Sequence, residues 1–189
     1  MDLLSKEYKE QLEQLHTKKK TFGRNTNQNA NDVVDYLIKY NPTSIIDYGC
    51  GKGELLPILQ RHCIFADVQG YDPAIPEYST LPDKKFDMLV STDVLEHIEP
   101  DYLDNVLQHI NATFTKVAYL IIACGPAKKT LPDGRNAHLI QEGLDWWKPR
   151  LEKHIDGQIV ETVYTDRTYF HDKKQTYLNK KEIKVIIKK

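Results

Sequence analysis

The sequence predicts an α/β fold: a mainly parallel sheet with helices on both faces and an antiparallel edge at its C-terminal end. Between residues 44 and 123, short apolar runs alternate with amphipathic stretches, which is the pattern of successive strand–helix–strand units. Two further strand-like segments, 158–164 and 181–188, have no helix between them, as in an antiparallel pair. The 189 residues are 40% apolar and 28% charged, which suits one globular domain.

Two helices are expected before the sheet. In the first, apolar residues recur every three or four positions and define one face of a helix. A polar break over residues 21–31 separates it from a second helix, expected over about 29–40. Pro42 ends the second helix, because the residue before a proline avoids the helical region. The apolar positions of the first helix are Leu4, Tyr8, Leu12 and Leu15.

The central part of the chain supplies the parallel strands and the helices between them. The run at 117–123 is the most apolar and predicts a strand buried on both faces. A helix over 144–155 is also expected, although Pro149 lies inside it. The other expected strands are 44–48, 65–71 and 86–90, and the other expected helices are 54–62 and 100–113.

Composition excludes several classes of protein. The formal net charge is −1, so a basic surface for non-specific nucleic-acid binding is not expected. The longest apolar run, 117–124, is too short to cross a bilayer. Residues 1–7 show no charged-then-apolar leader, so no secretory signal is expected. The three cysteines lack CxxC spacing, and reduced thiols in a cytoplasmic protein are the simplest interpretation.

A glycine-rich turn follows the first expected strand. Residues 47–53 read Asp-Tyr-Gly-Cys-Gly-Lys-Gly and lead into a helix, at the edge where parallel sheets bind ligands. Glycines let the backbone approach a ligand closely, and the helix N-terminus supplies N–H donors. Asp72 follows Gly51 by 21 residues, at the end of the next strand. A carboxylate there can accept hydrogen bonds from both ribose hydroxyls, so we expect a nucleoside ligand.

The turn lacks the sequence motifs that bind phosphate groups, and this narrows the class of nucleoside ligand that we expect. The dinucleotide fingerprint GxGxxG requires a glycine where this chain has Glu54, and a carboxylate beside a pyrophosphate is unfavourable. The chain contains no GxxxxGK[ST] loop for a nucleoside triphosphate. A ligand with a ribose and no phosphate fits better. A nicotinamide-dependent oxidoreductase is kept as a weaker alternative.

Three motifs, in order, resemble those of class I S-adenosylmethionine-dependent methyltransferases. Residues 47–53 resemble the first motif of that family, and Tyr71-Asp72-Pro73 resembles its ribose-binding motif. Residues 86–98, FDMLVSTDVLEHI, look like the stretch that ends the fourth strand in the small-molecule branch, types 11 and 12. The resemblance covers residues 44–125. It implies a Rossmann-like class I methyltransferase sandwich with a reversed last strand, and S-adenosyl-L-methionine as the cofactor.

The resemblance also implies cofactor-binding residues. Adenine contacts are expected within residues 77–85, without assignment to single residues. The cofactor carboxylate commonly meets the N-terminal lid in this family, where Arg24 could pair with it through two hydrogen bonds. A solvated loop arginine is the alternative. The other implied positions are Gly49, Cys50 and Gly51 for the methionine part, with Asp47 bracing the turn; Asp72 and Pro73 for the ribose; and Thr92 and Asp93 beside the cofactor.

Two histidines are candidates for the catalytic side. Methyl transfer from a sulfonium is an in-line displacement, so the protein aligns the acceptor and can remove its proton. His97 follows a strand near the expected methyl position and is the candidate base; packing beside Glu96 and Glu99 is the alternative. Those glutamates are expected to raise the pKa of His97. His138, in the loop 131–140, is the candidate substrate contact.

The same region raises the question of a metal ion. Asp93, Glu96 and His97 have i, i+3, i+4 spacing, so a helix would place them on one face. Some methyltransferases hold a catechol with magnesium, but they use a different arrangement of acidic residues. The sequence therefore favours a site without a metal ion.

We therefore predict a single methyltransferase domain over residues 1–189. Residues 1–41 would form a helical lid, 42–125 the cofactor-binding core, and 126–189 the substrate loop and the antiparallel end. The expected acceptor is an oxygen or nitrogen of a small molecule or saccharide, with no nucleic-acid or membrane partner. The alternatives are a methyltransferase acting on protein or tRNA, motivated by the seven lysines of residues 173–189, and a non-catalytic cofactor-binding module of the same fold.

Overall fold

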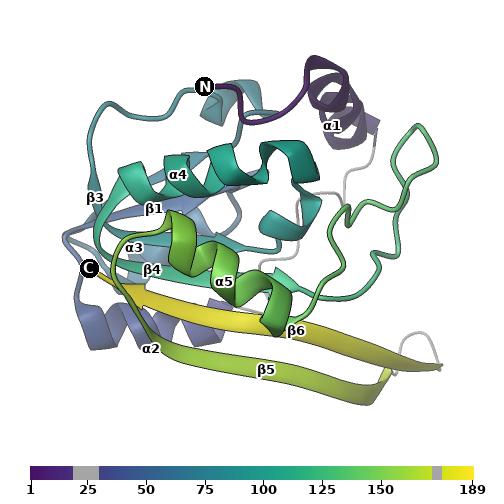
Figure 1. Cartoon of the computed structure of the whole chain (residues 1–189). Coiled ribbons are helices and arrows are strands. Elements are labelled where there is room, and N and C mark those ends of the chain that lie inside the picture. Colours follow the sequence, from purple (N-terminus) through teal and green to yellow (C-terminus); the bar gives the residue numbers. More distant parts are fainter. Residues whose placement is uncertain (19–29, 172–175) are drawn as a thin grey trace.

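One six-stranded sheet, in the order β2-β1-β3-β4-β6-β5, organises the chain (Figure 1). The computed structural model describes residues 1–18, 30–171 and 176–189, with side chains except at 18, 167, 169–171 and 176–179. The strands are β1 (Ser44–Tyr48), β2 (Asp67–Tyr71), β3 (Phe86–Thr92), β4 (Phe114–Ala123), β5 (Gln158–His171) and β6 (Thr176–Lys188). The α-helices are α1 (Lys6–Lys18), α2 (Ala30–Tyr40), α3 (Leu56–His62), α4 (Leu103–Thr113) and α5 (Leu144–His154).

The first four strands are parallel. β1 pairs with β2 on one side and with β3 on the other, and β3 pairs with β4. Parallel pairing requires a crossover after each strand. The crossovers carry α3 between β1 and β2, only the 3₁₀ turn at Pro76–Tyr78 between β2 and β3, and α4 between β3 and β4. The carboxyl ends of β1, β2, β3 and β4 therefore meet at one edge of the sheet, which is where sheets of this kind bind ligands.

Helices cover both faces of the sheet, as the sequence predicts (Figure 1). Along β3 the side chain of Leu89 packs with α4 and α5, whereas its neighbours Met88 and Val90 pack with α2 and α3 on the opposite face. This alternation follows from the pleat, which points successive side chains to opposite faces. The helices contribute Leu107 and Trp147 to the first of these cores and Val33 and Leu59 to the second.

The C-terminal end is antiparallel, as expected, but its strands are longer than predicted. β6 pairs antiparallel with β4 and with β5. The sequence predicts strands over 158–164 and 181–188, whereas the β5–β6 pairing continues to His171 and Thr176. This hairpin reaches beyond the other strands (Figure 1, lower right). Its outer part pairs only with itself, so it does not need the apolar pattern by which buried strands are predicted.

The helix predictions are confirmed with shifted ends. Helix α3 begins at Leu56 rather than 54, and Pro57 lies in its first turn, where a missing N–H costs little. Helix α5 forms despite Pro149. The predicted helix over 100–113 is divided into the 3₁₀ turn η4 (Pro100–Tyr102) and α4. Two further 3₁₀ turns are η2 (Pro76–Tyr78) and η3 (Leu95–His97). None of the helices in the described ranges is long and apolar enough to span a bilayer.

Helix α1 packs away from the main cores, on the loop that follows β4 (Figure 1, upper right). Tyr8 and Leu15 are 2% and 5% exposed, and they form a small apolar cluster with Leu131 and Ala137 of that loop. The apolar stripe of α1 thus packs against a loop, not against the sheet. Burial of this stripe holds the loop 126–140 in place beside the carboxyl edge of the sheet.

Candidate active site

The glycine turn after β1 requires glycine at its first position. Gly49 has φ +81°, a conformation that side chains with a Cβ rarely adopt. A Cβ built on Gly49 would lie 2.4 Å from Cγ2 of Val94, which is too close for any real contact. The N–H groups of Gly49 and Cys50 both donate to the carbonyl oxygen of Tyr71, at 2.7 and 3.1 Å. The turn is therefore tied to the end of β2, and a side chain at position 49 would collide with Val94.

Asp72 lies against this turn. Its Oδ2 accepts a hydrogen bond from the backbone N–H of Gly51 at 2.9 Å, and its Oδ1 accepts one from Ala74 at 2.9 Å. The side chain is 9% exposed, with Pro73 half-buried beside it. Each carboxylate oxygen has two lone pairs, so both can accept a further hydrogen bond from a ligand hydroxyl. The structure thus brings together the two motifs that the sequence places 21 residues apart.

A second carboxyl group, Asp47, lies beneath the turn. It is 3% exposed, and its pKa is raised to about 7, first by burial and then by the negative charge of Asp72. Two buried carboxyl groups that affect each other's charge favour a ligand that carries positive charge. They disfavour a pyrophosphate for the same reason.

Cys50 contributes its backbone, and not a reactive thiol, to the glycine turn. Its side chain is buried, and burial followed by the charges of Asp47 and Asp72 raises the pKa of the thiol well above its usual value. The thiolate is the nucleophilic form of cysteine, so a thiol held neutral is inert. A Cβ on Gly70 of β2 would approach Cys50 Sγ to 2.8 Å, so Cys50 packs tightly against that strand.

The end of β3 carries the next two predicted residues. Thr92 is half-buried and pairs with Ile121 of β4. Asp93 has φ +56°, an uncommon conformation for a residue with a Cβ, and its N–H donates to the carbonyl of Ile121 at 3.0 Å. Strained backbone of this sort clusters at functional sites. Here it turns the chain sharply at the carboxyl edge of the sheet. The next residue, Val94, packs over Gly49.

The two candidate histidines lie side by side. The rings of His97, on η3, and His138, on the loop after β4, have centroids 4.8 Å apart and are nearly perpendicular, at 89°. His97 Nδ1 is 2.7 Å from the carbonyl oxygen of Ala137, and His138 Nδ1 is 2.6 Å from that of Gly125. The fold therefore brings together two residues that the sequence assigns to separate roles.

The expected rise in the pKa of His97 is wrong. Its pKa is lowered to about 4, first by burial and then by His138. The hydrogen bond to Ala137 favours the charged form but does not offset the loss of solvation. The ring is therefore neutral near pH 7, and it is a weaker base than the sequence suggests.

Sequence reasoning does not select Glu96 or His16 as a site residue. Glu96, next to His97, is 0% exposed, although its position after β3 gives no sign of burial. His16 lies on α1, one residue after the buried Leu15; burial lowers its pKa, and the negative charge of Asp72 opposes this. The charge of Asp72 therefore acts on the imidazole of His16. In the sequence, His16 follows the apolar Leu12 by four residues, and this spacing predicts that His16 faces inward with it.

Helix α1 is joined to the catalytic side of the site by two hydrogen bonds. The Tyr8 hydroxyl donates to the backbone carbonyl of His97 at 2.6 Å, and Gln11 Nε2 donates to Asp133 Oδ2 at 3.0 Å. Arg24, the residue of the lid that is predicted to bind the cofactor, lies outside the described part of the chain.

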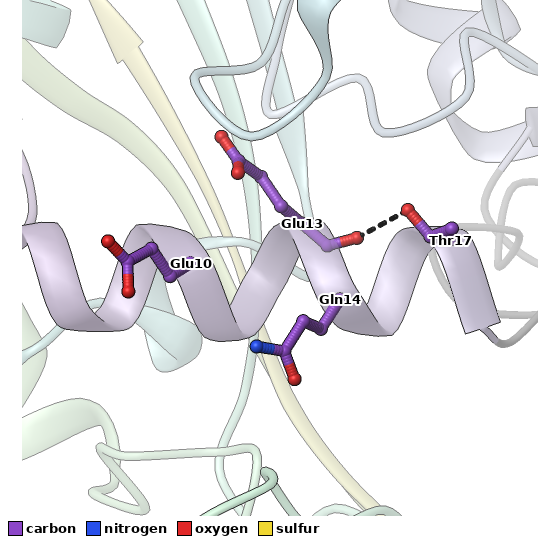
Figure 2. Close-up of a pocket in the computed structure, with 4 residues that line it drawn as sticks. All are labelled: Glu10, Glu13, Gln14 and Thr17. Atoms are coloured by element: carbon purple, nitrogen blue, oxygen red, sulfur yellow. Dashed lines mark hydrogen bonds between the residues drawn. The ribbon is translucent and has the colours of Figure 1, made fainter.

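The outer face of α1 carries a shallow hollow that is unrelated to these residues. Figure 2 shows its lining by Glu10, Glu13, Gln14 and Thr17, all exposed, with the Thr17 hydroxyl bonded to the carbonyl of Glu13 at 2.8 Å. None of the predicted site residues lines it. The carboxyl edge of the sheet, not this hollow, therefore holds the candidate active site.

The chain belongs to the methyltransferase domain family, whose model it matches over residues 6–167. With this sheet topology and the glycine turn at its carboxyl edge, it is a class I methyltransferase, and an enzyme. No curated protein matches the chain at a significant level.

Several solved structures share the fold. The 1,6-didemethyltoxoflavin-N1-methyltransferase of Burkholderia thailandensis, solved with S-adenosylhomocysteine, is 14% identical with a TM-score of 0.63; the match covers 100% of this chain and 92% of that one. TehB from Haemophilus influenzae is 15% identical with a TM-score of 0.60, over 95% of this chain and 67% of that one. The mitomycin 7-O-methyltransferase MmcR is 13% identical with a TM-score of 0.64, over 94% of this chain and 60% of that one. At these identities the likeness concerns the fold.

Proposed function

We propose that the protein transfers a methyl group from S-adenosyl-L-methionine to an oxygen or nitrogen of a small molecule or saccharide. The observation that carries this proposal is the contact between Asp72 and the backbone N–H of Gly51. This contact brings a buried carboxylate, which can accept hydrogen bonds from ribose hydroxyls, next to the glycine turn.

Charge supports this cofactor over a dinucleotide. Asp47 and Asp72 form an acidic floor under the turn, and the elevated pKa of Asp47 means that its ionised form lacks a compensating cation. A sulfonium nucleoside with an amino-acid tail brings positive charge, whereas a nicotinamide dinucleotide brings a pyrophosphate. In this proposal the backbone of Gly49, Cys50 and Gly51 contacts the methionine part. Asp72, with Pro73 beside it, holds the ribose.

The catalytic side is assigned to the end of β3 and the loop after β4. When bound, S-adenosylmethionine supplies a methyl carbon whose bond to sulfur breaks as the acceptor's lone pair attacks, with the bonding electrons kept by sulfur. Thr92 and Asp93 position that methyl group, and His97 and His138 face the acceptor. Helix α1 and the loop 126–140 exclude water from the reacting atoms.

A small acceptor is favoured because α1 and this loop pack against each other beside the site. Two of the similar structures are named as methyltransferases of small molecules, a 1,6-didemethyltoxoflavin N1-methyltransferase and a mitomycin 7-O-methyltransferase. Arg24 is kept as the candidate partner of the cofactor carboxylate. A methyltransferase acting on protein or tRNA is the second candidate, because seven lysines lie within residues 173–189.

The release of S-adenosylhomocysteine tests the proposal. The full chain is incubated with S-adenosylmethionine and a panel of phenols, alcohols, amines and saccharides, with bulk tRNA and a protein mixture as separate arms. We expect turnover with a small acceptor and its loss in Asp72→Ala. Turnover only with tRNA or protein would overturn the acceptor class. Binding of cofactor with no turnover in any arm would indicate a non-catalytic module.

A further inference from the structure

Three metal-binding side chains converge beside the proposed methyl position. Glu96, His97 and His138 each offer one ligand atom, and these atoms all lie within 4.8 Å of one another. Glu96 and His97 come from η3, after β3, and His138 comes from the loop after β4. The spacing of Asp93, Glu96 and His97 suggests a different trio. In the fold, His138, which follows His97 by 41 residues, takes the place of Asp93 in this trio.

Glu96 is the acidic member of this group, and burial, followed by the negative charge of Asp93, raises its pKa well above the usual value. It is 0% exposed; Oε1 accepts a weak hydrogen bond from the N–H of Ala123 at 3.2 Å, and Oε2 is buried with no hydrogen-bond partner. Among the residues that the structure describes, no lysine or arginine forms an ion pair with it. A buried carboxylate is costly unless it is paired, coordinates a metal ion or takes up a proton, and a bound cation would favour its ionised form.

In both histidines Nδ1 faces a backbone carbonyl, and this contact sets the tautomer of the neutral ring. A backbone carbonyl can only accept a hydrogen bond, so the contacts to Ala137 and Gly125 require the proton on Nδ1 in each neutral ring. The lone pair then lies on Nε2. A backbone carbonyl that fixes the tautomer and orientation of an imidazole is the usual support of a metal-binding histidine. The hydroxyl of Tyr8 further fixes the backbone of His97.

We propose that Glu96, His97 and His138 bind a divalent transition-metal ion. Two imidazoles and one carboxylate suit Zn²⁺, Mn²⁺, Fe²⁺ or Co²⁺, whereas Mg²⁺ and Ca²⁺ prefer oxygen ligands throughout. At metal–ligand distances of about 2.1 Å, ligand atoms lie at most about 4.2 Å apart. Closing from 4.8 Å requires a rotation of the Glu96 carboxyl and small shifts of the loop that carries His138.

The role of the ion rests on the proposed function. Three protein ligands leave coordination positions open, and these lie on the side where the acceptor is placed. A metal-bound hydroxyl loses its proton at lower pH than a free one, so the acceptor oxygen would reach the methyl carbon as an alkoxide or phenolate while its proton leaves to solvent. The site therefore points to a hydroxyl-bearing acceptor. His97 and His138 then hold the metal ion, in place of proton abstraction by His97.

Metal binding can be measured without any cofactor. The full chain, freed of metal with a chelator, is titrated with Co²⁺, whose visible absorption reports imidazole coordination, and with Zn²⁺ in competition. We expect one ion per chain and a 10–100-fold or larger loss of affinity in Glu96→Gln and in His138→Ala. The matched controls Glu142→Gln and His62→Ala change exposed residues and should bind as the unmodified chain does.

Because Glu96 is fully buried, a second readout uses the unmodified chain. Bound Co²⁺ should protect His97 and His138, but not His62, from diethyl pyrocarbonate. Absence of a saturable Co²⁺ spectrum, or equal affinity in His138→Ala, would overturn the metal site. Asp72→Ala separates the two proposals, since it should lose cofactor affinity and keep Co²⁺ affinity. Metal binding by a chain that does not bind S-adenosylmethionine would instead overturn the proposed function alone.

Discussion

The hydroxyl of Tyr8 donates a hydrogen bond to the backbone carbonyl of His97 at 2.6 Å, across 89 residues of sequence. Tyr8 is 2% exposed and belongs to the apolar cluster that joins α1 to the loop 126–140. A helix that the sequence identifies only as a lid is thus bonded to the segment that carries the candidate catalytic residues. The stability of α1 and the geometry of that segment are coupled through this contact.

This coupling predicts the effect of Tyr8→Phe. Loss of the hydroxyl leaves the carbonyl of His97 without this donor and should cost about 0.5–1.5 kcal/mol. Amide exchange should become faster in residues 6–18 and 131–140 together, since both belong to one cluster. Cofactor should slow exchange in the same residues. Hydrogen-exchange mass spectrometry with Tyr164→Phe, an exposed tyrosine of β5, provides the comparison. Faster exchange confined to α1 would show that the loop is held independently.

The glycine turn predicts unequal costs for two Gly→Ala changes. Gly49 and Gly134 both have positive φ, +81° and +89°, so both substitutions incur the backbone penalty of about 1 kcal/mol. A Cβ at Gly134 meets nothing within 4 Å, whereas at Gly49 it would meet Val94 at 2.4 Å. Gly49→Ala should therefore lower the free energy of unfolding by more, typically 1–3 kcal/mol beyond Gly134→Ala.

The double variant Gly49→Ala, Val94→Ala isolates the steric part of that cost. Removal of the valine methyl groups should make Gly49→Ala less damaging than it is beside the intact Val94. Chemical denaturation of Gly49→Ala, Gly134→Ala, Val94→Ala and the double variant measures each difference. Equal destabilisation by Gly49→Ala and Gly134→Ala would mean that Val94 moves aside without cost.

The raised pKa of Asp47 predicts how stability depends on pH. The pKa is about 7 in the folded chain and about 3.9 when the chain is unfolded, so between these values the folded state holds the extra proton. Its contribution is full below pH 4 and is lost as pH rises through 7, a change on the order of 4 kcal/mol. Asp47→Asn should remove this dependence. Denaturation curves of the unmodified chain and of Asp47→Asn between pH 4.5 and 8 measure this dependence. A difference in stability between the two chains that does not change with pH would disprove the assignment.

The same group predicts proton release on cofactor binding. A cationic ligand above Asp47 and Asp72 favours the ionised carboxylate, so the pKa of Asp47 should fall from about 7 when S-adenosylmethionine binds. At pH 6, binding should therefore release close to one proton. Calorimetry in buffers of different ionisation enthalpy measures this number. Neutral adenosine should release fewer protons, and Asp47→Asn none; release that is unaltered in Asp47→Asn would place the titrating group elsewhere.

The parts of the fold that local patterns specify were predictable from the sequence. The parallel strands and the packing of helices on both faces follow from apolar periodicity, and the turn at Gly49 follows from its glycines. The extent of the β5–β6 hairpin was not predictable from the sequence, because its outer residues pair only with each other. Pro149 lowers the helix propensity of its segment, but the burial of Trp147 and Leu151 in the core outweighs it.

Contacts between distant segments explain what the sequence could not predict about the site. The pKa of His97 depends on burial beneath α1 and beside His138, neither of which is near it in the chain. The sequence places Glu96 and Glu99 next to His97, and reasoning from these neighbours gives the wrong direction. Glu99 is in fact turned away to Ser5, whose N–H and hydroxyl donate to it at 2.8 Å.

The central claim is that the turn at Gly49–Gly51 and Asp72 together bind S-adenosylmethionine, and its most direct test is the equilibrium affinity of Asp72→Ala. Loss of hydrogen bonds from this carboxylate should weaken binding of S-adenosylmethionine by roughly 1.5–3 kcal/mol, about 10–150-fold. The exposed Asp101→Ala is the matched control and should bind as the unmodified chain does, and NAD should bind to neither. Unchanged affinity for S-adenosylmethionine in a folded Asp72→Ala chain, measured by calorimetry, would contradict the account.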